Sequence, residues 1–178
     1  MASAARRKGW GSGIGSTVRA VPSDRFYSRL SMSLGATGLR WTGRLNVPLY
    51  RASGGRLMGR IGRAPVLLLT TTGRKSGEPR VAPVVYLADG ERLVVIDTNA
   101  GNERIPAWSL NLKAEPEAEV EVGRKRLSVR ARIAQGEERA ELWRRHIEQY
   151  AGFDDYEAVL DREISVFVLE PRQLAAAV

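Results

Sequence analysis

The chain has 178 residues, 43% of them apolar and 27% charged, a composition typical of one globular domain. It contains no cysteine and one histidine, which excludes disulfides, thiol nucleophiles, iron–sulfur clusters and any metal site built from several histidines. Its longest apolar stretches, residues 64–69 and 81–88, are far too short to cross a bilayer.

The net charge of +8 is concentrated near the start of the chain. Residues 1–64 hold twelve lysines and arginines and one acid, whereas residues 65–178 have a net charge of −3. This asymmetry predicts a basic, partly disordered arm over 1–64, a domain over 65–172 and a tail over 173–178.

The arm combines apolar side chains with its basic charge. Residues 23–34 predict a short amphipathic helix. Residues 39–62 alternate large apolar side chains with arginines, but neither a helical nor a strand period holds for long. This composition is typical of a segment lying in a lipid headgroup layer, and a mobile tail is an equally good interpretation.

The domain begins with strand signals. Residues 66–72 predict a buried strand, followed by a turn through Gly73 and Gly77. Residues 80–88 predict a second strand, in which Pro83 indicates an edge or a bulge. Asp89-Gly90 predicts a hairpin leading into the strand 93–96.

The rest of the domain mixes helices and strands. We expect helices at 102–114, with Pro106 in the first turn, at 137–150 and at 154–160, and strands at 118–122, 127–134 and 165–169. With Arg124 and Lys125 as the turn, Glu119 faces Arg130 and Glu117 faces Arg132. Those carboxylates therefore form a cross-strand charge ladder rather than an acid/base site. Mostly antiparallel strands with helices inserted late indicate an α+β barrel.

Few side chains suit catalysis without a cofactor. His146 lies on an amphipathic helix, where a surface or half-buried packing role is more typical than that of a base. Residues 73–77 lack the spacing of a phosphate loop. An enzyme of this composition would depend on the chemistry of a bound cofactor.

Two segments are candidates for binding one. The turn over 70–80 carries Arg74, Lys75 and Arg80, and its glycines predict an anion nest of outward-pointing amides, although a solvated hairpin tip has the same composition. The Asn/Gly-rich loop at 98–102 leads into a helix on which Trp108 and Asn111 share a face. That segment suits a planar polar ring, but Trp108 alone is equally well explained as a core anchor.

The order of these segments resembles the deazaflavin-dependent nitroreductase family over about residues 60–172. The resemblance lies in TTTGRKSG at 70–77, Pro83, the Asn/Gly loop, P-x-W-x-x-N-L at 106–112 and residues 162–171. It implies a split β-barrel like that of the FMN-binding pyridoxamine-phosphate oxidases, with helices packed on the barrel. It also implies coenzyme F420, an 8-hydroxy-5-deazaflavin.

The same resemblance implies a set of site residues. Arg74, Lys75 and Arg80 would hold the coenzyme's phosphate and polyglutamate tail, with a hydroxyl from Ser76, and Tyr150 and Tyr156 would be catalytic. The residues implied to line the ring are Pro83, Thr98, Asn99, Trp108 and Asn111. The implied reaction is hydride transfer from the reduced ring to a quinone, a nitro compound or an unsaturated lactone.

The chain departs from the family pattern at three positions. Phe153 stands where nitro-reducing members usually carry a third tyrosine, Asn99 where a lysine is usual, and Asp97 where a small residue is usual. The loss of a hydroxyl at Phe153 bears on nitro reduction in particular.

The basic arm resembles that of the membrane-associated branch. It implies a cytoplasmic protein held at an anionic membrane surface by residues 1–64, acting on a lipophilic acceptor as a monomer or a homodimer. Two alternatives stay open, an FMN-binding split barrel and a non-catalytic anion-binding protein. A nucleic-acid partner is not expected, because the aromatic residues do not form a stacking platform, and neither is a metal.

Overall fold

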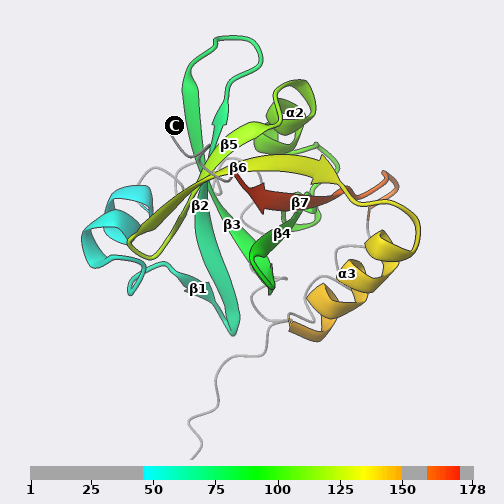
Figure 1. Ribbon diagram of the computed structural model, residues 1–178, viewed down its shortest axis with the longest axis horizontal. Coiled ribbons are helices and arrows are strands. Elements are labelled where there is room, and N and C mark those ends of the chain that lie inside the picture. The colour runs from blue at the N-terminus through cyan, green and yellow to red at the C-terminus, as the bar shows by residue number, and fades with distance from the viewer. Residues whose placement is uncertain (1–45, 150–159, 173–178) are drawn as a thin grey trace, which may run out of the picture.

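The computed structural model describes residues 46–149 and 160–172 (Figure 1). Most of the arm, residues 154–159 of the predicted helix, and Tyr150, Phe153 and Tyr156 lie outside these ranges. Residues 46–53 are helical. The other elements are β1 (Arg60–Ile61), β2 (Ala64–Thr72), β3 (Pro79–Asp89), β4 (Arg92–Ile96), a 3-10 turn (Asn99–Gly101), α2 (Ala107–Ala114), β5 (Glu117–Val122), β6 (Lys125–Ile133), α3 (Gly136–Gln149) and β7 (Val166–Pro171).

Six antiparallel strands close into a barrel. The strand order is β2-β3-β4-β7-β6-β5, and β5 pairs back with β2 to complete the ring. The two-residue strand β1 adds to β2 through Arg60 and Ile61. The predicted α+β barrel is therefore confirmed.

The barrel closes because each strand presents one apolar face to its interior. Leu67 and Leu69 of β2 lie two apart and both point inward. The same interior cluster receives Val84, Val95, Val120, Val129, Ala131, Phe167 and Leu169 from the other strands and Leu112 from α2. Helix α2 thus covers an end of the barrel interior.

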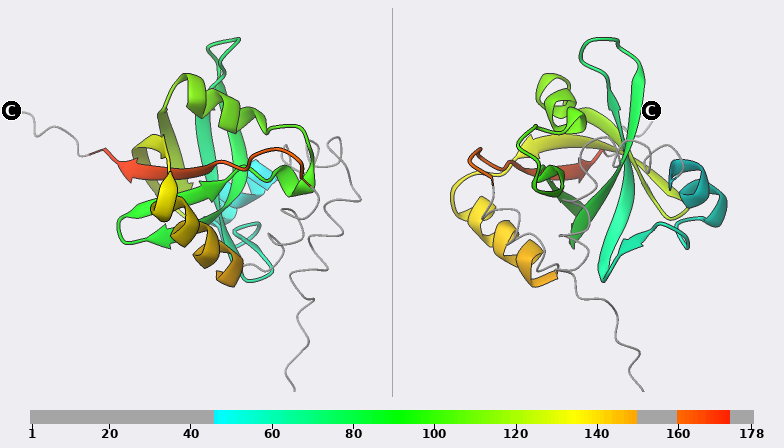
Figure 2. Two further views of the ribbon diagram at one scale, coloured as in Figure 1. Left: turned by 90° about the vertical axis from the view of Figure 1, so that its right-hand side faces the viewer. Right: turned by 180° about the vertical axis from the view of Figure 1, so that it is seen from behind.

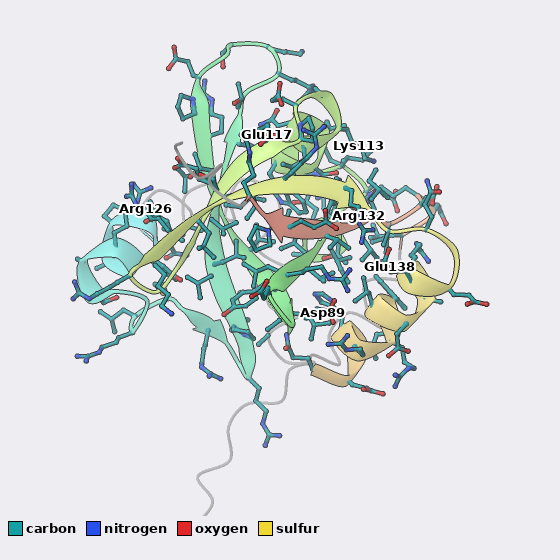
Figure 3. All side chains as sticks on the ribbon, viewed as in Figure 1. Asp89, Lys113, Glu117, Arg126, Arg132 and Glu138 are labelled. Atoms are coloured by element: carbon teal, nitrogen blue, oxygen red, sulfur yellow. The ribbon has the colours of Figure 1, made fainter. Side chains whose placement is uncertain are left out.

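Helix α3 packs on the outside of the barrel (Figure 1, Figure 2). Leu142 and Trp143 contact the outward-facing side chains of β4 and β7, such as Val94 and Val168. Beside this contact Arg132 of β6 forms an ion pair with Glu138 of α3 at 2.6 Å; both side chains are labelled in Figure 3. The Arg132 guanidinium holds the pKa of the Glu138 carboxyl below its usual range.

Two predictions about the elements need correction. The turn between β5 and β6 is formed by Gly123 and Arg124, since Val122 pairs with Lys125. Glu117 therefore faces Arg130, with which it forms an ion pair of 2.7 Å, and the predicted register is wrong by two residues. Gly123 has φ +62° and suits the first position of a tight hairpin turn. A shift of two keeps every side chain on its face. Glu119 then faces Ser128, and the cross-strand ion pairs that form are Glu117–Arg130 and Glu121–Arg126.

Helix α2 begins later than predicted. Pro106 is its N-cap, with ψ of 144°, and the helix starts at Ala107 rather than at 102. Pro83 pairs with Leu68 on one edge of β3, while β4 pairs with β3 only from Tyr86 onward. The proline thus occupies a section of β3 with one paired edge, where its missing N–H is tolerated.

Residues 46–64, assigned to the arm from sequence, are packed on the barrel. The side chain of Tyr50 is 1% exposed, and its hydroxyl accepts a hydrogen bond from Gly123 N at 2.9 Å and lies 3.1 Å from Val66 O. A Cβ at Gly54, where φ is +62°, would lie 2.8 Å from Arg124 Nε, so the close approach favours glycine. In the described part of the chain, no helix has the length and apolar character to cross a membrane.

Replacing Tyr50 with phenylalanine should lower the free energy of unfolding by about 1–3 kcal/mol, because Gly123 N would lose its acceptor. Urea denaturation measures this. Tyr86→Phe is the control, since the half-buried Tyr86 hydroxyl makes no hydrogen bond to the described residues. Equal losses in the two variants would contradict the role given to the Tyr50 hydroxyl.

Candidate functional site

The turn between β2 and β3 projects past the barrel beside α2 (Figure 1, Figure 2). The strands on either side are in register up to the pair Thr72–Pro79. Gly77, with φ +70°, reverses the chain, and Gly77 N donates to Gly73 O at 2.7 Å. This frame presents Arg74, Lys75 and Arg80 at the surface, where all three are exposed.

The predicted anion nest is wrong, because the amides of the turn are used within it. Gly73 N donates to Glu78 O, Ser76 N donates to Gly73 O, and Glu78 N lies 3.3 Å from Ser76 Oγ. The Ser76 hydroxyl also accepts from Arg80 at 3.3 Å. Binding of an anion here would depend on side-chain charge.

That charge is uncommitted within the described part of the chain. Arg74, Lys75 and Arg80 form no ion pair with any described carboxylate. Three exposed cations with one acid, Glu78, between them suit an anionic group with several negative charges.

Asn111 joins the turn to α2. Its side chain is 3% exposed; Oδ1 accepts from Arg74 N at 3.1 Å and Nδ2 donates to Thr71 Oγ1 at 3.0 Å. Both ends of the amide are therefore engaged within the protein. Asn111 fixes the position of the turn relative to the helix, and so links the two motifs singled out in the sequence.

The loop before α2 has an unusual backbone. Asn99 and Ala100 have positive φ values of 49° and 54°, and Gly101 follows with 77°. The Asn99 side chain donates to Arg104 O at 2.6 Å, and Thr98 is 4% exposed. Both predicted ring contacts are thus held firmly in the loop.

Trp108 and Pro83 lie on different sides of the sheet. Trp108 packs against the interior cluster and meets Phe167 edge to face, with ring centroids 5.6 Å apart. Ala82 and Val84 also point to that cluster, so Pro83 between them points outward, and it is exposed. The structure brings Asn111 to the cationic turn. Pro83 of β3 and Trp108 of α2, however, lie on opposite sides of the sheet.

A buried polar cluster beneath the loop was missed from sequence. Asp97 is fully buried and contacts Ser109, Arg162 and Ser165. An acid directly after the apolar run 93–96 was the available signal, because a carboxylate buried at the end of a strand needs partners. Its partners come from distant parts of the chain, which no local pattern reveals.

These features fit the coenzyme that the resemblance implies. An anionic tail of phosphate and carboxylates needs uncommitted cations, and the exposed turn supplies three. A flat ring needs a rigid support, and the residues from Thr98 to Asn111 supply a fixed loop and an indole.

Comparisons with known proteins agree with this fit. Residues 41–171 match the F420H(2)-dependent quinone reductase family. An F420H(2)-dependent quinone reductase of Mycobacterium tuberculosis (strain H37Rv) is 38% identical over 133 residues, which cover 72% of this chain and 89% of the relative.

Two solved structures agree in fold and sequence. One, titled as an F420-H2-dependent reductase, is 36% identical with a TM-score of 0.56 and covers 60% of this chain and 94% of its own. The other, titled as a domain-swapped dimer, is 32% identical with a TM-score of 0.58 and covers 74% and 98%. The barrel, the ordered motifs and the match over 41–171 together place this chain in the F420H(2)-dependent quinone reductase family.

Proposed function

We propose that this chain transfers a hydride from reduced coenzyme F420 to a quinone at the end of the barrel that carries the cationic turn and α2. Membership of the family makes the protein an oxidoreductase with coenzyme F420 as its cofactor. The main support for this location is the pair of hydrogen bonds made by the Asn111 side chain. They fix the turn, whose cations form no ion pair with a described residue, to the helix that bears Trp108.

Arg74, Lys75 and Arg80 would hold the anionic tail of the coenzyme, and Trp108, Thr98 and Asn99 would support its ring. When bound, coenzyme F420 supplies the hydride, and a proton completes reduction of the quinone to the hydroquinone. Tyr150 and Tyr156 are our candidates for handling that proton. The role of the protein is to hold donor and acceptor in a reactive orientation.

The test is a titration of the purified protein with oxidised F420 and, separately, with FMN, followed by fluorescence. Tight binding of FMN and none of F420 would favour the FMN-binding alternative. Reduced F420 is then assayed against a quinone (menadione), a nitroimidazole and an unsaturated lactone. Turnover of the quinone is expected, and absence of turnover with any acceptor would contradict the proposal.

Replacing Arg74 and Lys75 together with alanine should weaken F420 binding at least tenfold, because each charged hydrogen bond contributes about 1.5–3 kcal/mol. The matched control is Arg124→Ala with Lys125→Ala, an equal loss of charge in the turn region between β5 and β6. The control should bind F420 with unchanged affinity. Equal weakening in both variants would mean that only overall charge matters.

We also propose that residues 1–64 hold the protein at an anionic membrane surface on the cytoplasmic side. The described part of this segment leaves Leu49, Leu57, Met58 and Ile61 between 42% and 57% exposed, next to Arg56, Arg60 and Arg63. Tyr50 ties the segment to the β5–β6 hairpin, which adds Arg124, Lys125, Arg126 and Leu127. Apolar side chains among cations suit an interface with anionic lipid.

A pocket of about 220 Å³ at this surface supports an anionic lipid as partner. Its lining includes Arg51, Arg124 and Arg126 around one carboxylate, Glu121. Arg51 bonds Glu121 at 2.6 Å and holds the pKa of that carboxyl below its usual range. Two positive charges remain uncompensated in the lining, which a lipid phosphate can neutralise.

The membrane proposal predicts salt-sensitive sedimentation with phosphatidylglycerol vesicles and none with phosphatidylcholine. Leu57→Ser with Met58→Ser should reduce the bound fraction severalfold, whereas Ile133→Ser, an apolar side chain 41% exposed on β6, should not. Capture by DNA instead of vesicles would favour the alternative of a non-catalytic anion-binding protein. Light scattering of the protein without vesicles distinguishes a monomer from a homodimer.

A further inference from the structure

The loop between β4 and α2 holds three successive residues in the left-handed backbone region. They are Asn99, Ala100 and Gly101, with φ values of +49°, +54° and +77°. Glycine enters this region freely, but in alanine the Cβ crowds the backbone. Such a conformation persists only where the surrounding contacts hold it in place.

Asp97, at the start of the loop, supplies the first of these contacts. It is fully buried, and its Oδ2 accepts a hydrogen bond from Ser109 Oγ at 2.7 Å. Its Oδ1 accepts from Ser165 N at 2.8 Å. Since Ser109 lies in the first turn of α2 and Ser165 directly precedes β7, the start of the loop is tied to both elements.

Arg162 supplies the second set. One terminal nitrogen lies 3.2 Å from Asp97 Oδ1, and the other donates to Asp97 O at 2.6 Å and reaches Asn102 O at 3.5 Å. Asp97 and Asn102 flank the loop, so one guanidinium holds both of its ends. The ammonium group of a lysine lacks the planar fork needed to reach the same oxygens together.

The position of this pair relative to the site indicates its role. Both carboxylate oxygens of Asp97 and both terminal nitrogens of Arg162 are engaged within the protein, so neither side chain is placed to bind a ligand directly. Thr98 and Asn99 follow Asp97 in the chain, and Trp108 precedes its partner Ser109. A buried ion pair is a weak source of stability compared with apolar packing, but this one bonds backbone oxygens at both ends of the loop.

We infer that Asp97 and Arg162 are positioning residues that hold the 98–102 loop and the start of α2 in the form that receives the coenzyme's ring. The inference rests on the proposed function. It assigns a role in coenzyme binding to two side chains that do not touch the coenzyme. It also explains how an alanine is kept in a left-handed conformation within that loop.

The test compares Asp97→Asn and Arg162→Lys with Asp89→Asn, a matched control in which another arginine-paired carboxylate is neutralised away from the loop. F420 affinity should fall about tenfold in each loop variant and stay within twofold of wild type in the control. Amide hydrogen exchange at residues 99–102, measured without coenzyme, should rise in the loop variants alone. If either loop variant fails to fold, Ser109→Ala replaces it in the comparison, because it removes only one hydrogen bond to Asp97.

The double variant Asp97→Asn with Arg162→Lys should bind F420 only slightly more weakly than either single variant, because both changes release the same loop. Folded loop variants with wild-type affinity and wild-type exchange at 99–102 would overturn the inference. Failure of the wild-type protein to bind F420 would instead overturn the proposed function, and the exchange experiment would still report on the loop.

Discussion

Replacing Asn111 with leucine is expected to lower the free energy of unfolding by about 2–4 kcal/mol and to weaken F420 binding at least tenfold. Leucine has a similar size but bonds neither Arg74 N nor Thr71 Oγ1, which both contact the Asn111 amide. Each polar group left unpaired in a buried setting costs about 1–3 kcal/mol. The cationic turn would then lose its fixed position beside α2.

Urea denaturation measures the free energy of unfolding, and F420 titration measures the binding affinity. Amide hydrogen exchange at Arg74 N reports whether the turn has lost its fixed position. Lys113→Ala, an exposed change on the same helix, is the control and should alter neither quantity (Figure 3). Thr71→Val removes the partner of a single bond, so it should cost less than Asn111→Leu. Unchanged exchange at Arg74 N in Asn111→Leu would show that the turn does not depend on this clasp.

The free energy of unfolding is expected to fall by about 2 kcal/mol between pH 7 and pH 5 because of His146 alone. The imidazole is fully buried in α3, and burial lowers its pKa from 6.5 to about 4. Below pH 6.5 the unfolded chain binds a proton that the folded protein excludes, so stability is lost as the pH falls from 6.5 towards 4. The full difference in pKa corresponds to about 3 kcal/mol.

His146→Gln should flatten the dependence of the free energy of unfolding on pH between pH 7 and pH 5, as measured by urea denaturation at steps of half a pH unit. The slope is the quantity to compare, since glutamine also changes the packing of α3. Carboxylates with lowered pKa values, such as Asp89 and Glu138, lose their stabilising contribution only below about pH 4.5, outside the interval from pH 7 to pH 5. Parallel curves for the two proteins would contradict the role of His146.

Local patterns in the sequence predicted the elements but not all of their pairings. The apolar run at 66–72 and the turn at Gly73 to Gly77 appear as expected, because period and glycine content act within a few residues. The β5–β6 register was wrong, although charge pairing was expected. From charge alone, Glu117 can pair equally well with Arg130 or with Arg132. The structure has the Arg130 register, in which Gly123 occupies the turn with a positive φ.

His146 and Asn111 show the same limit for single side chains. The sequence favoured a surface or half-buried place for His146, but α3 packs that face on the barrel and buries it completely. Asn111 was expected to face a ring, whereas both ends of its amide bond the turn and β2. Burial and hydrogen-bond partners depend on which element packs above a residue, and that is not a local property.

The sequence by itself determined the barrel class, the cationic turn with Arg74, Lys75 and Arg80, and the family, because these depend on residue type and order along short stretches. Only the tertiary structure decided that Tyr50 anchors residues 46–59 to the barrel, that Asn111 clasps the turn, and that Asp97 and Arg162 meet beneath the loop. Those contacts join residues 37 to 73 positions apart in the chain. They exist because closure of the six strands brings distant segments side by side, and the polar groups buried between them must find partners.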